Sequence, residues 1–408
     1  MKKIALVSTY HINCGIARFA EILESSIIDA EITVFPLHRN ELKESFGGTQ
    51  ESANKFITNL VESLKNFDAV CIQYEYSLLS DSTSESTKRL IQIVQANPNT
   101  TVTFHTIYNK TAKPKSSGAL KSFLKLNFKE SARRLLHHRT AYTGHTLEEN
   151  LFKKLAMIGT KIIVHTQSST SLLKNNFQLK KVFSHPLSYT SEADKEKYKH
   201  STCKANVLHK LGLEDDSYLI GVFGFLGDYK GFDYAIDTLS LLDKKYKLLI
   251  CGGLHPSAIK HNNTTDVNTL LNKIKLNKEL IKNQIPLRER VFFLGSLEDD
   301  EMYETIAAMD MCWLPYREVG QEASAIASEV SELGKRVVLA RTNTFEEYRK
   351  FKMRNDTLFF EIGNTAELRL KTLRYDEMTE KQHLENTANI TNHLQMQSNF
   401  YLQILLNE

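Results

Sequence analysis

A chain of 408 residues is longer than one hydrophobic core usually organises, so we expect two domains. Hydrophobic residues make up 41% and charged residues 25%, an ordinary globular composition, and a formal net charge of +4 argues against a polyanion partner for the whole molecule. The five cysteines are odd in number and far apart, which argues against disulfides and a cysteine zinc site and favours buried free thiols.

The N-terminal residues do not have the pattern of a signal peptide. Met-Lys-Lys is followed by only four apolar residues, Ile4 to Val7, whereas an apolar signal region needs about 7–15. No later stretch approaches the roughly 20 apolar residues of a spanning helix. We therefore expect an intracellular, cytoplasmic protein, with peripheral association at the inner face of a membrane left open.

Short apolar runs alternate with stretches of helical spacing through the first half of the chain. The expected strands are 4–8, 32–35, 69–73, 101–105 and 161–165. Strands that are nearly continuous in apolar residues and separated by helices indicate a parallel sheet covered on both faces.

The first expected strand runs into a turn at Gly15, followed by Ile16 and then by helical spacing. A glycine at a strand-to-helix turn lets the backbone approach a ligand, and the first N–H groups of the helix are available to an anion. A plain tight turn explains the same pattern equally well.

A basic segment follows at 110–139, with nine Lys and Arg against one acid, Glu130. Four of these residues, Lys121, Lys125, Lys129 and Arg133, are spaced four apart and form one stripe of a helix, beside an apolar stripe. Such a helix suits an anionic membrane surface or a phosphate backbone. A solvated helix that covers the N-terminal core is an equally good interpretation.

The alternation is interrupted at 188–205, which is polar, lacks periodicity and is interpreted as a linker. It resumes with expected strands at 218–223, 246–250, 291–294, 311–314 and 336–339. The predicted architecture is therefore α/β, with two doubly wound Rossmann-like domains, 1–187 and 206–376, facing across a cleft. A C-terminal helical segment, 377–408, follows, and its return to the first domain is left open.

Negative findings narrow the chemistry. No G-x-G-x-x-G follows the first strand, and no G-x-x-x-x-G-K-[ST] occurs anywhere in the chain. No two aspartates are separated by one residue, so an Asp-x-Asp metal clamp is absent. We therefore predict no metal site.

The loop from Gly224 to Gly231 follows the expected strand 218–223 and carries Lys230. Glycines beside one lysine at the carboxyl end of a strand suit a diphosphate, because backbone amides approach and the ammonium supplies charge. A glycine-rich turn with a solvated lysine is the weaker alternative.

A helix is expected to begin near Ser324 and Ala325, where small residues allow its N-terminus to face a diphosphate. Glu329 lies on this helix, and a carboxylate there can accept both hydroxyls of a ribose. We interpret Glu332, three residues further on, as a residue of the helix surface.

The order and spacing of these motifs resemble the retaining glycosyltransferases of family 4, which have the two-domain GT-B fold. The similarity covers most of the chain, and although each motif is weak alone, their combination is specific. The matching segments, in chain order, are Gly15-Ile-Ala17, Gln73-Tyr-Glu75-Tyr, Phe104-His105-Thr106, Gly224 to Gly231, Cys251-Gly-Gly253, Val291-Phe-Phe-Leu-Gly295, Ala308-Met-Asp310 through Pro315-Tyr316, and the Glu329 helix.

The resemblance implies transfer of a sugar, with retention, from a UDP- or GDP-linked donor held mainly by the second domain. Lys230 matches the family lysine that contacts the diphosphate, Glu329 the glutamate that binds ribose, and His105 the histidine near the transferred sugar. The amides around Gly15 and Ser324 would complete the phosphate cradle. Electrostatic stabilisation rather than a protein nucleophile is implied, without a cofactor or a required metal.

Two positions depart from the family pattern. The arginine that commonly follows the first glycine of the diphosphate loop is Phe225 here, and the glutamate that commonly lies eight residues before Glu329 is Gln321. One charge on the diphosphate must therefore come from elsewhere, and Arg18 and Arg317 are the candidates.

Three functions remain open at this point. The leading one is a glycosyltransferase for a cell-envelope glycan or a lipid-linked acceptor at the membrane surface. A glycosyltransferase that acts on modified nucleic acid would use the basic segment instead. A non-catalytic nucleotide-sugar-binding protein would explain the two departures.

Overall fold

The computed structural model describes residues 1–12, 14–108, 128–199, 203–254, 265–276, 286–349, 357–378 and 393–407. They form two compact units. The first unit contains Met1–Pro186, Val319–Ala323 and Gln395–Glu408, and the second contains Leu187–Glu318 and Ser324–Leu394.

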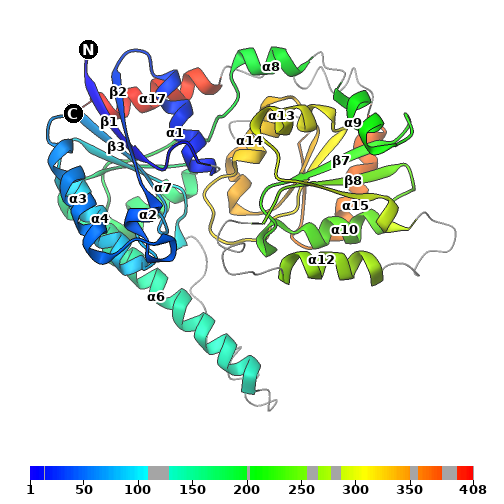
Figure 1. Ribbon diagram of the computed structural model, residues 1–408, viewed down its shortest axis with the longest axis horizontal. Helices are drawn as coiled ribbons and strands as arrows, with labels where there is room; N and C mark the ends of the chain where they lie inside the picture. The colour runs from blue at the N-terminus through cyan, green and yellow to red at the C-terminus, as the bar shows by residue number, and fades with distance from the viewer. Residues whose placement is uncertain are drawn as a thin grey trace. The chain divides into compact units, whose positions relative to one another are not determined.

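The first unit is built on a parallel sheet of six strands (Figure 1). The strands are β1 (Lys3–Ser8), β2 (Glu31–Pro36), β3 (Ala69–Tyr74), β4 (Thr100–Phe104), β5 (Lys161–Val164) and β6 (Val182–Ser184). Their order across the sheet is β2-β1-β3-β4-β5-β6, so β2 is added on one side of β1 and the later strands on the other, and the strand order reverses between β1 and β3. Ligands of open α/β sheets bind at such a switch point.

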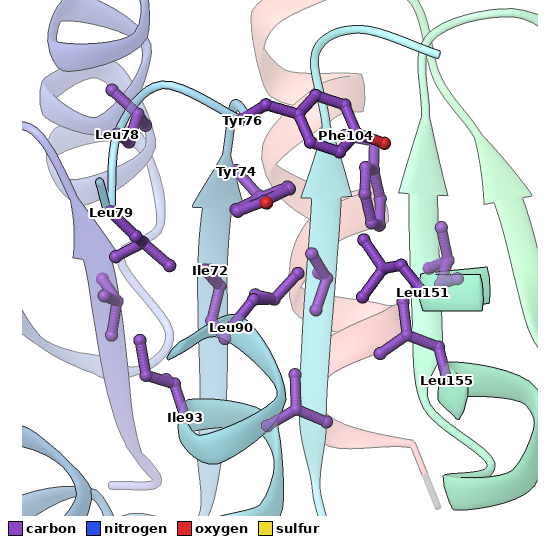
Figure 2. Packing of buried hydrophobic residues seen from close by; sticks show 14 of the residues in the cluster. Ile72, Tyr74, Tyr76, Leu78, Leu79, Leu90, Ile93, Phe104, Leu151 and Leu155 are labelled. Carbon is purple, nitrogen blue, oxygen red and sulfur yellow. The ribbon is translucent and has the colours of Figure 1, made fainter. Parts of the chain in front are cut away.

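Helices cover both faces of this sheet. One layer contains α3 (Gln50–Leu64), α4 (Thr83–Gln95), α6 (Phe128–Ile158) and α7 (Gln167–Phe177). Figure 2 shows part of its apolar core, where Leu90 of α4 lies beside Ile72 of β3 and Leu151 of α6 lies beside Phe104 of β4. The opposite face is covered by α1 (Gly15–Ser26) and α17 (His393–Leu406), which Figure 1 shows beside each other. The short α2 (Arg39–Leu42) lies before α3.

Local sequence explains where several of these helices begin. Thr49 and Ser52 form a capping box at the start of α3, because each side chain accepts a hydrogen bond from the other's backbone N–H. At the starts of α4 and α7 only one of these two hydrogen bonds is present: the side chains of Ser82 and Thr166 each accept from a backbone N–H in the first turn of the helix. These caps satisfy N–H groups that a helix leaves without an internal partner.

The second unit also has a parallel sheet of six strands. The strands are β7 (Tyr218–Phe223), β8 (Tyr246–Cys251), β9 (Val291–Gly295), β10 (Met311–Leu314), β11 (Val337–Ala340) and β12 (Leu358–Phe360). Their order is β12-β11-β10-β7-β8-β9, which places the switch point between β7 and β10. The loops after these two strands therefore lie where a ligand is expected.

Two apolar clusters cover the two faces of this sheet. One contains side chains of α10 (Phe232–Ser240), α12 (Thr265–Leu276) and α15 (Thr365–Asp376). The other contains side chains of α8 (Glu192–Lys199), α9 (Cys203–Leu211), α13 (Asp299–Ala308) and α14 (Ala325–Glu332). Both sheets are therefore doubly wound, as the sequence predicted.

The stretch 188–205, which we interpreted as a linker, contains helices. This stretch contains α8 and the start of α9, and Tyr198 and Cys203 are buried in the second unit. A short helix can be held by a few tertiary contacts even when its own sequence lacks an apolar stripe. Two strands of three residues, β6 and β12, were also not expected.

The predicted segments at 110–139 and 377–408 fall partly outside the described residues. Within them the backbone is helical from Phe128 in α6, and from His393 to Leu406 in α17. No helix in the described part of the chain is long and apolar enough to cross a membrane. All five cysteines are free thiols, four of them buried.

Candidate functional site

Lys230 lies at the switch point of the second sheet, at the end of the short turn η3 (Asp228–Lys230) after β7. It is 5% exposed, and its Nζ donates a hydrogen bond to Tyr316 Oη at 2.5 Å and lies 3.9 Å from the centre of that ring. Within the described residues no carboxylate pairs with it. Burial without a counter-charge lowers the pKa of Lys230 to about 7. A buried ammonium with neutral partners is a site that an anionic ligand completes.

Glycines bring the loops around Lys230 together. At Gly224, where φ is +113°, a Cβ would lie 3.1 Å from Lys230 Cε, so a side chain there would crowd the lysine. At Gly231, where φ is +68°, a Cβ would lie 1.9 Å from the carbonyl oxygen of Pro315. The loops after β7 and β10 therefore approach as closely as their backbones allow, and only glycine fits between them.

Tyr316 connects Lys230 to the N-terminus of α14. Its hydroxyl lies 3.0 Å from Ser324 Oγ, which in turn caps the helix by accepting a hydrogen bond from Ala327 N at 3.3 Å. Burial, then the neighbouring Tyr229 and, more weakly, the charge of Glu329 raise the pKa of Tyr316, so the phenol stays neutral. The predicted residues Lys230, Ser324 and Glu329 thus gather around Tyr316, while Ala325 is the first residue of α14.

The interpretation of Glu332 as a surface residue is wrong. Its side chain is buried at 3% exposure. The carboxylate accepts hydrogen bonds from Ser188 Oγ at 2.6 Å and from the backbone N–H groups of Tyr189 at 3.0 Å and Thr190 at 2.8 Å. It therefore anchors the beginning of the second unit to α14, and Glu329, at 1% exposure, is buried on the same helix.

Arg317 already has two carboxylate partners. Its Nη2 donates to Asp233 Oδ2 at 2.8 Å, its Nη1 lies 3.1 Å from Asp228 Oδ1, and its guanidinium lies 4.4 Å from the centre of the Tyr234 ring. These contacts join the turn η3 to α10. The prediction that Arg317 supplies the charge missing at Phe225 would require it to leave this ion pair or share it.

In the first unit, the predicted phosphate-binding turn leads into α1 at the switch point between β1 and β3. Gly15 and Ile16 are the first two residues of the helix, Cys14 provides no side-chain cap, and the first turn contains no acid. Arg18 lies half-buried in the same first turn. This arrangement leaves a positive helix end that is compatible with an anion.

His105 follows β4 and contacts the residues of neighbouring strands. Its Nε2 lies 3.0 Å from Gln73 Oε1, and its ring centre lies 5.0 Å from that of His165. Burial, and then the neighbouring His165, hold the pKa of His105 well below its usual range. The imidazole is therefore neutral near pH 7.

Gln321 and Glu322 belong to the first unit, although they lie in sequence between segments of the second. Gln321 forms an antiparallel bridge with Thr106. The Glu322 carboxylate is fully buried and accepts hydrogen bonds from Ser169 Oγ at 2.6 Å and Thr166 Oγ1 at 3.1 Å, at the start of α7. Glu322 thus fixes the segment Val319–Ala323 to the first sheet.

The candidate residues therefore form one group in each unit. Lys230, Ser324, Ala325, Glu329 and Arg317 belong to the second unit, and Gly15, Ile16, Arg18, His105 and Gln321 to the first. Sequence reasoning missed the importance of Tyr316 and Gln73, although both lie within motifs at the ends of strands. In the described part of the chain, no group of three or more His, Cys, Asp or Glu side chains is arranged to hold a metal ion.

No protein-family model and no curated protein sequence matches this chain. Solved structures match it over nearly its whole length. They include HepE of Anabaena in complex with UDP, at 15% identity and a TM-score of 0.61, covering 99% of this chain and 96% of that one. Sucrose-phosphate synthase from Thermosynechococcus elongatus matches at 14% identity and a TM-score of 0.63, covering 99% of each chain.

A glycosyltransferase from Rickettsia africae matches at 13% identity and a TM-score of 0.65, covering 100% of this chain and 99% of that one. At such low identity these similarities show the fold alone. They confirm the predicted two-domain α/β fold of the GT-B glycosyltransferases.

Proposed function

We propose that this protein is a glycosyltransferase that moves a sugar from a nucleoside diphosphate sugar to an acceptor. The observation that carries the proposal is Lys230, a buried lysine without a carboxylate partner among the described residues, at the switch point of the second sheet. The fold supports it, since the similar structure of HepE is in complex with UDP. A diphosphate supplies the negative charge that the surroundings of Lys230 lack.

In this proposal the leaving group is a nucleoside diphosphate, which gains negative charge as the bond to the sugar breaks. Protonated Lys230 stabilises that charge, and the N-terminus of α14 adds its dipole. Glu329 holds the ribose hydroxyls, and His105 of the first unit, which is neutral, accepts a hydrogen bond from a sugar hydroxyl. Retention of stereochemistry follows from the resemblance to family 4, with the departing phosphate as the base.

The direct test combines donor binding with one substitution. A panel of UDP- and GDP-linked sugars is screened by thermal shift, because a ligand that binds the folded state raises its melting temperature. Lys230→Ala should then lower turnover of the best donor by about 2–4 kcal/mol of transition-state stabilisation, with an unchanged circular dichroism spectrum. A variant that keeps near-wild-type turnover would remove Lys230 from the site.

A second candidate function is a nucleotide-sugar-binding protein without catalysis. Phe225 in place of the family arginine, together with the ion pairs of Arg317, favours it because the diphosphate then contacts fewer cations. The two functions differ in slow donor hydrolysis, which glycosyltransferases commonly show without an acceptor. Release of nucleoside diphosphate that requires Lys230 would identify the enzyme, and tight binding without release would identify the binding protein.

We propose a cell-envelope glycan or a lipid-linked intermediate as the acceptor. The basic segment 110–139 supports this proposal, because an amphipathic helix with a stripe of Lys and Arg suits an anionic membrane surface. Modified nucleic acid is the competing acceptor, since the same charges suit phosphates. Binding to anionic vesicles, compared with retardation of DNA at moderate salt, distinguishes the two.

A further inference from the structure

The face of the first sheet that α1 and α17 cover contains a row of polar side chains. Tyr401 Oη of α17 lies 3.3 Å from Thr103 Oγ1 of β4. Thr103 Oγ1 accepts a hydrogen bond from Gln73 Nε2 of β3 at 3.4 Å, and Gln73 Oε1 lies 3.0 Å from His105 Nε2. Tyr401, Thr103 and Gln73 are all at most 1% exposed. A continuous hydrogen-bonded row therefore joins the C-terminal helix to His105.

This row fixes the orientation of the Gln73 side-chain amide. Its nitrogen faces two acceptors, Thr103 Oγ1 and Cys71 Sγ at 3.3 Å. Turning the amide over would let its oxygen accept from the Thr103 hydroxyl and the Cys71 thiol, but one of its two N–H groups would have no acceptor, because among the described residues only His105 Nε2 faces that side. The buried position leaves no water to pair with that N–H group, so the observed orientation is favoured.

The amide orientation in turn determines which nitrogen of His105 carries the proton. A carbonyl oxygen only accepts hydrogen bonds, so His105 Nε2 must donate to Gln73 Oε1. Because burial and His165 hold the pKa of His105 well below its usual range, the ring carries one proton. Nδ1 therefore has a lone pair, and no described residue donates to it.

Packing restricts rotation of the same ring. The Phe19 ring, on α1, packs edge-to-face with His105 with ring centres 5.7 Å apart, and Phe19 also contacts Tyr401 at 5.8 Å. His165 lies on a further side at 5.0 Å. A side chain held by packing and by one directed hydrogen bond presents its remaining nitrogen in a defined direction.

We propose that Gln73 is a positioning residue that locks His105 in the Nε2–H tautomer and so presents Nδ1 as an acceptor for a sugar hydroxyl. Thr103 and Tyr401 hold Gln73 in the required orientation, so α17 contributes to the site without contacting a ligand. The role of the hydroxyl rests on the proposed function, whereas the tautomer lock does not.

The tautomer is measured directly on the intact, ligand-free protein. Long-range proton–nitrogen correlation spectra of ¹⁵N-histidine-labelled protein distinguish a protonated ring nitrogen from one with a lone pair. The signals of His105 are identified by their loss in His105→Gln. We expect Nε2–H with an unprotonated Nδ1 near pH 7. A wild-type ring with its proton on Nδ1 would overturn the proposal, whether or not any variant folds.

Two variants test the lock itself. Gln73→Leu removes the acceptor and should mix the two tautomers, whereas the carboxylate of Gln73→Glu keeps an acceptor at Nε2 but favours the imidazolium and should add a proton at Nδ1. With the best donor of the thermal-shift panel, Gln73→Leu should lower kcat about tenfold, the size of one lost hydrogen bond, and Gln73→Glu should lower kcat as well, because Nδ1 no longer accepts. A pure Nε2–H tautomer in folded Gln73→Leu would refute the lock. Absence of transfer by the wild type would refute the proposed function and leave the tautomer result standing.

Discussion

The proton on Lys230 makes donor binding depend on pH. With a pKa of about 7 in the empty site, the lysine is mostly charged below pH 7 and mostly neutral above it. A bound diphosphate raises that pKa, because an opposite charge close by favours the ammonium. Binding above pH 7 therefore takes up a proton, and affinity falls as pH rises. Between about pH 6.5 and 8.5 the charged fraction of the empty site falls roughly 25-fold, which corresponds to about 2 kcal/mol.

Titration calorimetry with a nucleotide sugar measures the affinity and the number of protons taken up on binding. A nucleotide sugar is a suitable ligand because its phosphates do not ionise in this pH range. The affinity should fall roughly 25-fold between the two pH values. Repeating the titration at pH 8 in buffers of different ionisation enthalpy should reveal nearly one proton taken up per donor bound. Lys230→Met, which keeps the length of the side chain but has no charge, should bind weakly and without this dependence. Equal affinity at both pH values with no proton uptake would refute the reasoning.

The same lysine should destabilise the empty protein. Its pKa is about 7 when folded and about 10.4 when unfolded, so between these values the unfolded state binds more protons and stability rises with pH. Below pH 7 both states are protonated and the full penalty of about 4–5 kcal/mol applies. Lys230→Met should therefore raise the melting temperature of the empty protein by several degrees near pH 7, with a smaller gain towards pH 10. A lower melting temperature of the variant would show that the buried ammonium does not destabilise the folded protein.

Three further predictions concern other parts of the chain. Glu329→Gln should weaken nucleoside diphosphate binding by about 1–2 kcal/mol with a small effect on kcat, because a ribose contact exists before and during transfer. Unchanged affinity in calorimetry would show that Glu329 has a structural role and does not bind the ribose. Lys161 Nζ donates to Asn99 Oδ1 at 2.8 Å and to carbonyl oxygens at the end of α17, and Lys161→Met removes this donor. Hydrogen exchange in α17 should therefore accelerate, and the free energy of unfolding should fall by about 1–3 kcal/mol. Unaltered exchange would mean that apolar packing alone holds the helix. Reversal of Lys121 and Lys125 to Glu should abolish vesicle binding at about 1 kcal/mol per charge while donor hydrolysis continues, and a wild type that binds neither vesicles nor DNA would leave the segment as a solvated helix.

The fold was predictable because most of its strands are short, nearly continuous runs of apolar residues, which can be recognised from the local sequence. All six residues of β3 and of β8 are buried, as expected for the interior of a parallel sheet covered on both faces. The strands β6 and β12 have three residues each, too few to show a period. A signal for α8 was present in 188–205 but was missed. Ser191 and Asp194 form a capping box, with Asp194 N donating to Ser191 Oγ at 3.1 Å and Ser191 N to Asp194 Oδ2 at 3.2 Å.

The partners of the site residues were less predictable, because they depend on contacts between distant parts of the sequence. The role of Glu332 depends on Ser188, which lies 144 residues earlier in the chain. Local pattern assigns a glutamate on a short helix to the surface, and only the folded chain brings donors to it. Arg317 illustrates the same limit, since its pairing with Asp233 spans 84 residues. Residue type and position at a strand end predicted the candidates, but not what each one contacts.

The two units share one chemical arrangement at their switch points. Each holds a basic side chain whose pKa burial lowers, and each gives that base a neutral partner instead of a carboxylate: Tyr316 for Lys230 and Gln73 for His105. A carboxylate would satisfy either base in the empty protein, and a ligand would then have to displace it. A phenol or an amide orients the base, and the charge of the ammonium or the second nitrogen of the imidazole then remains available to a ligand. Lys230→Met should therefore weaken donor binding as well as turnover, whereas Gln73→Leu should affect turnover at unchanged donor affinity. If both variants instead lost donor affinity equally, the two bases would not have the separate roles proposed here.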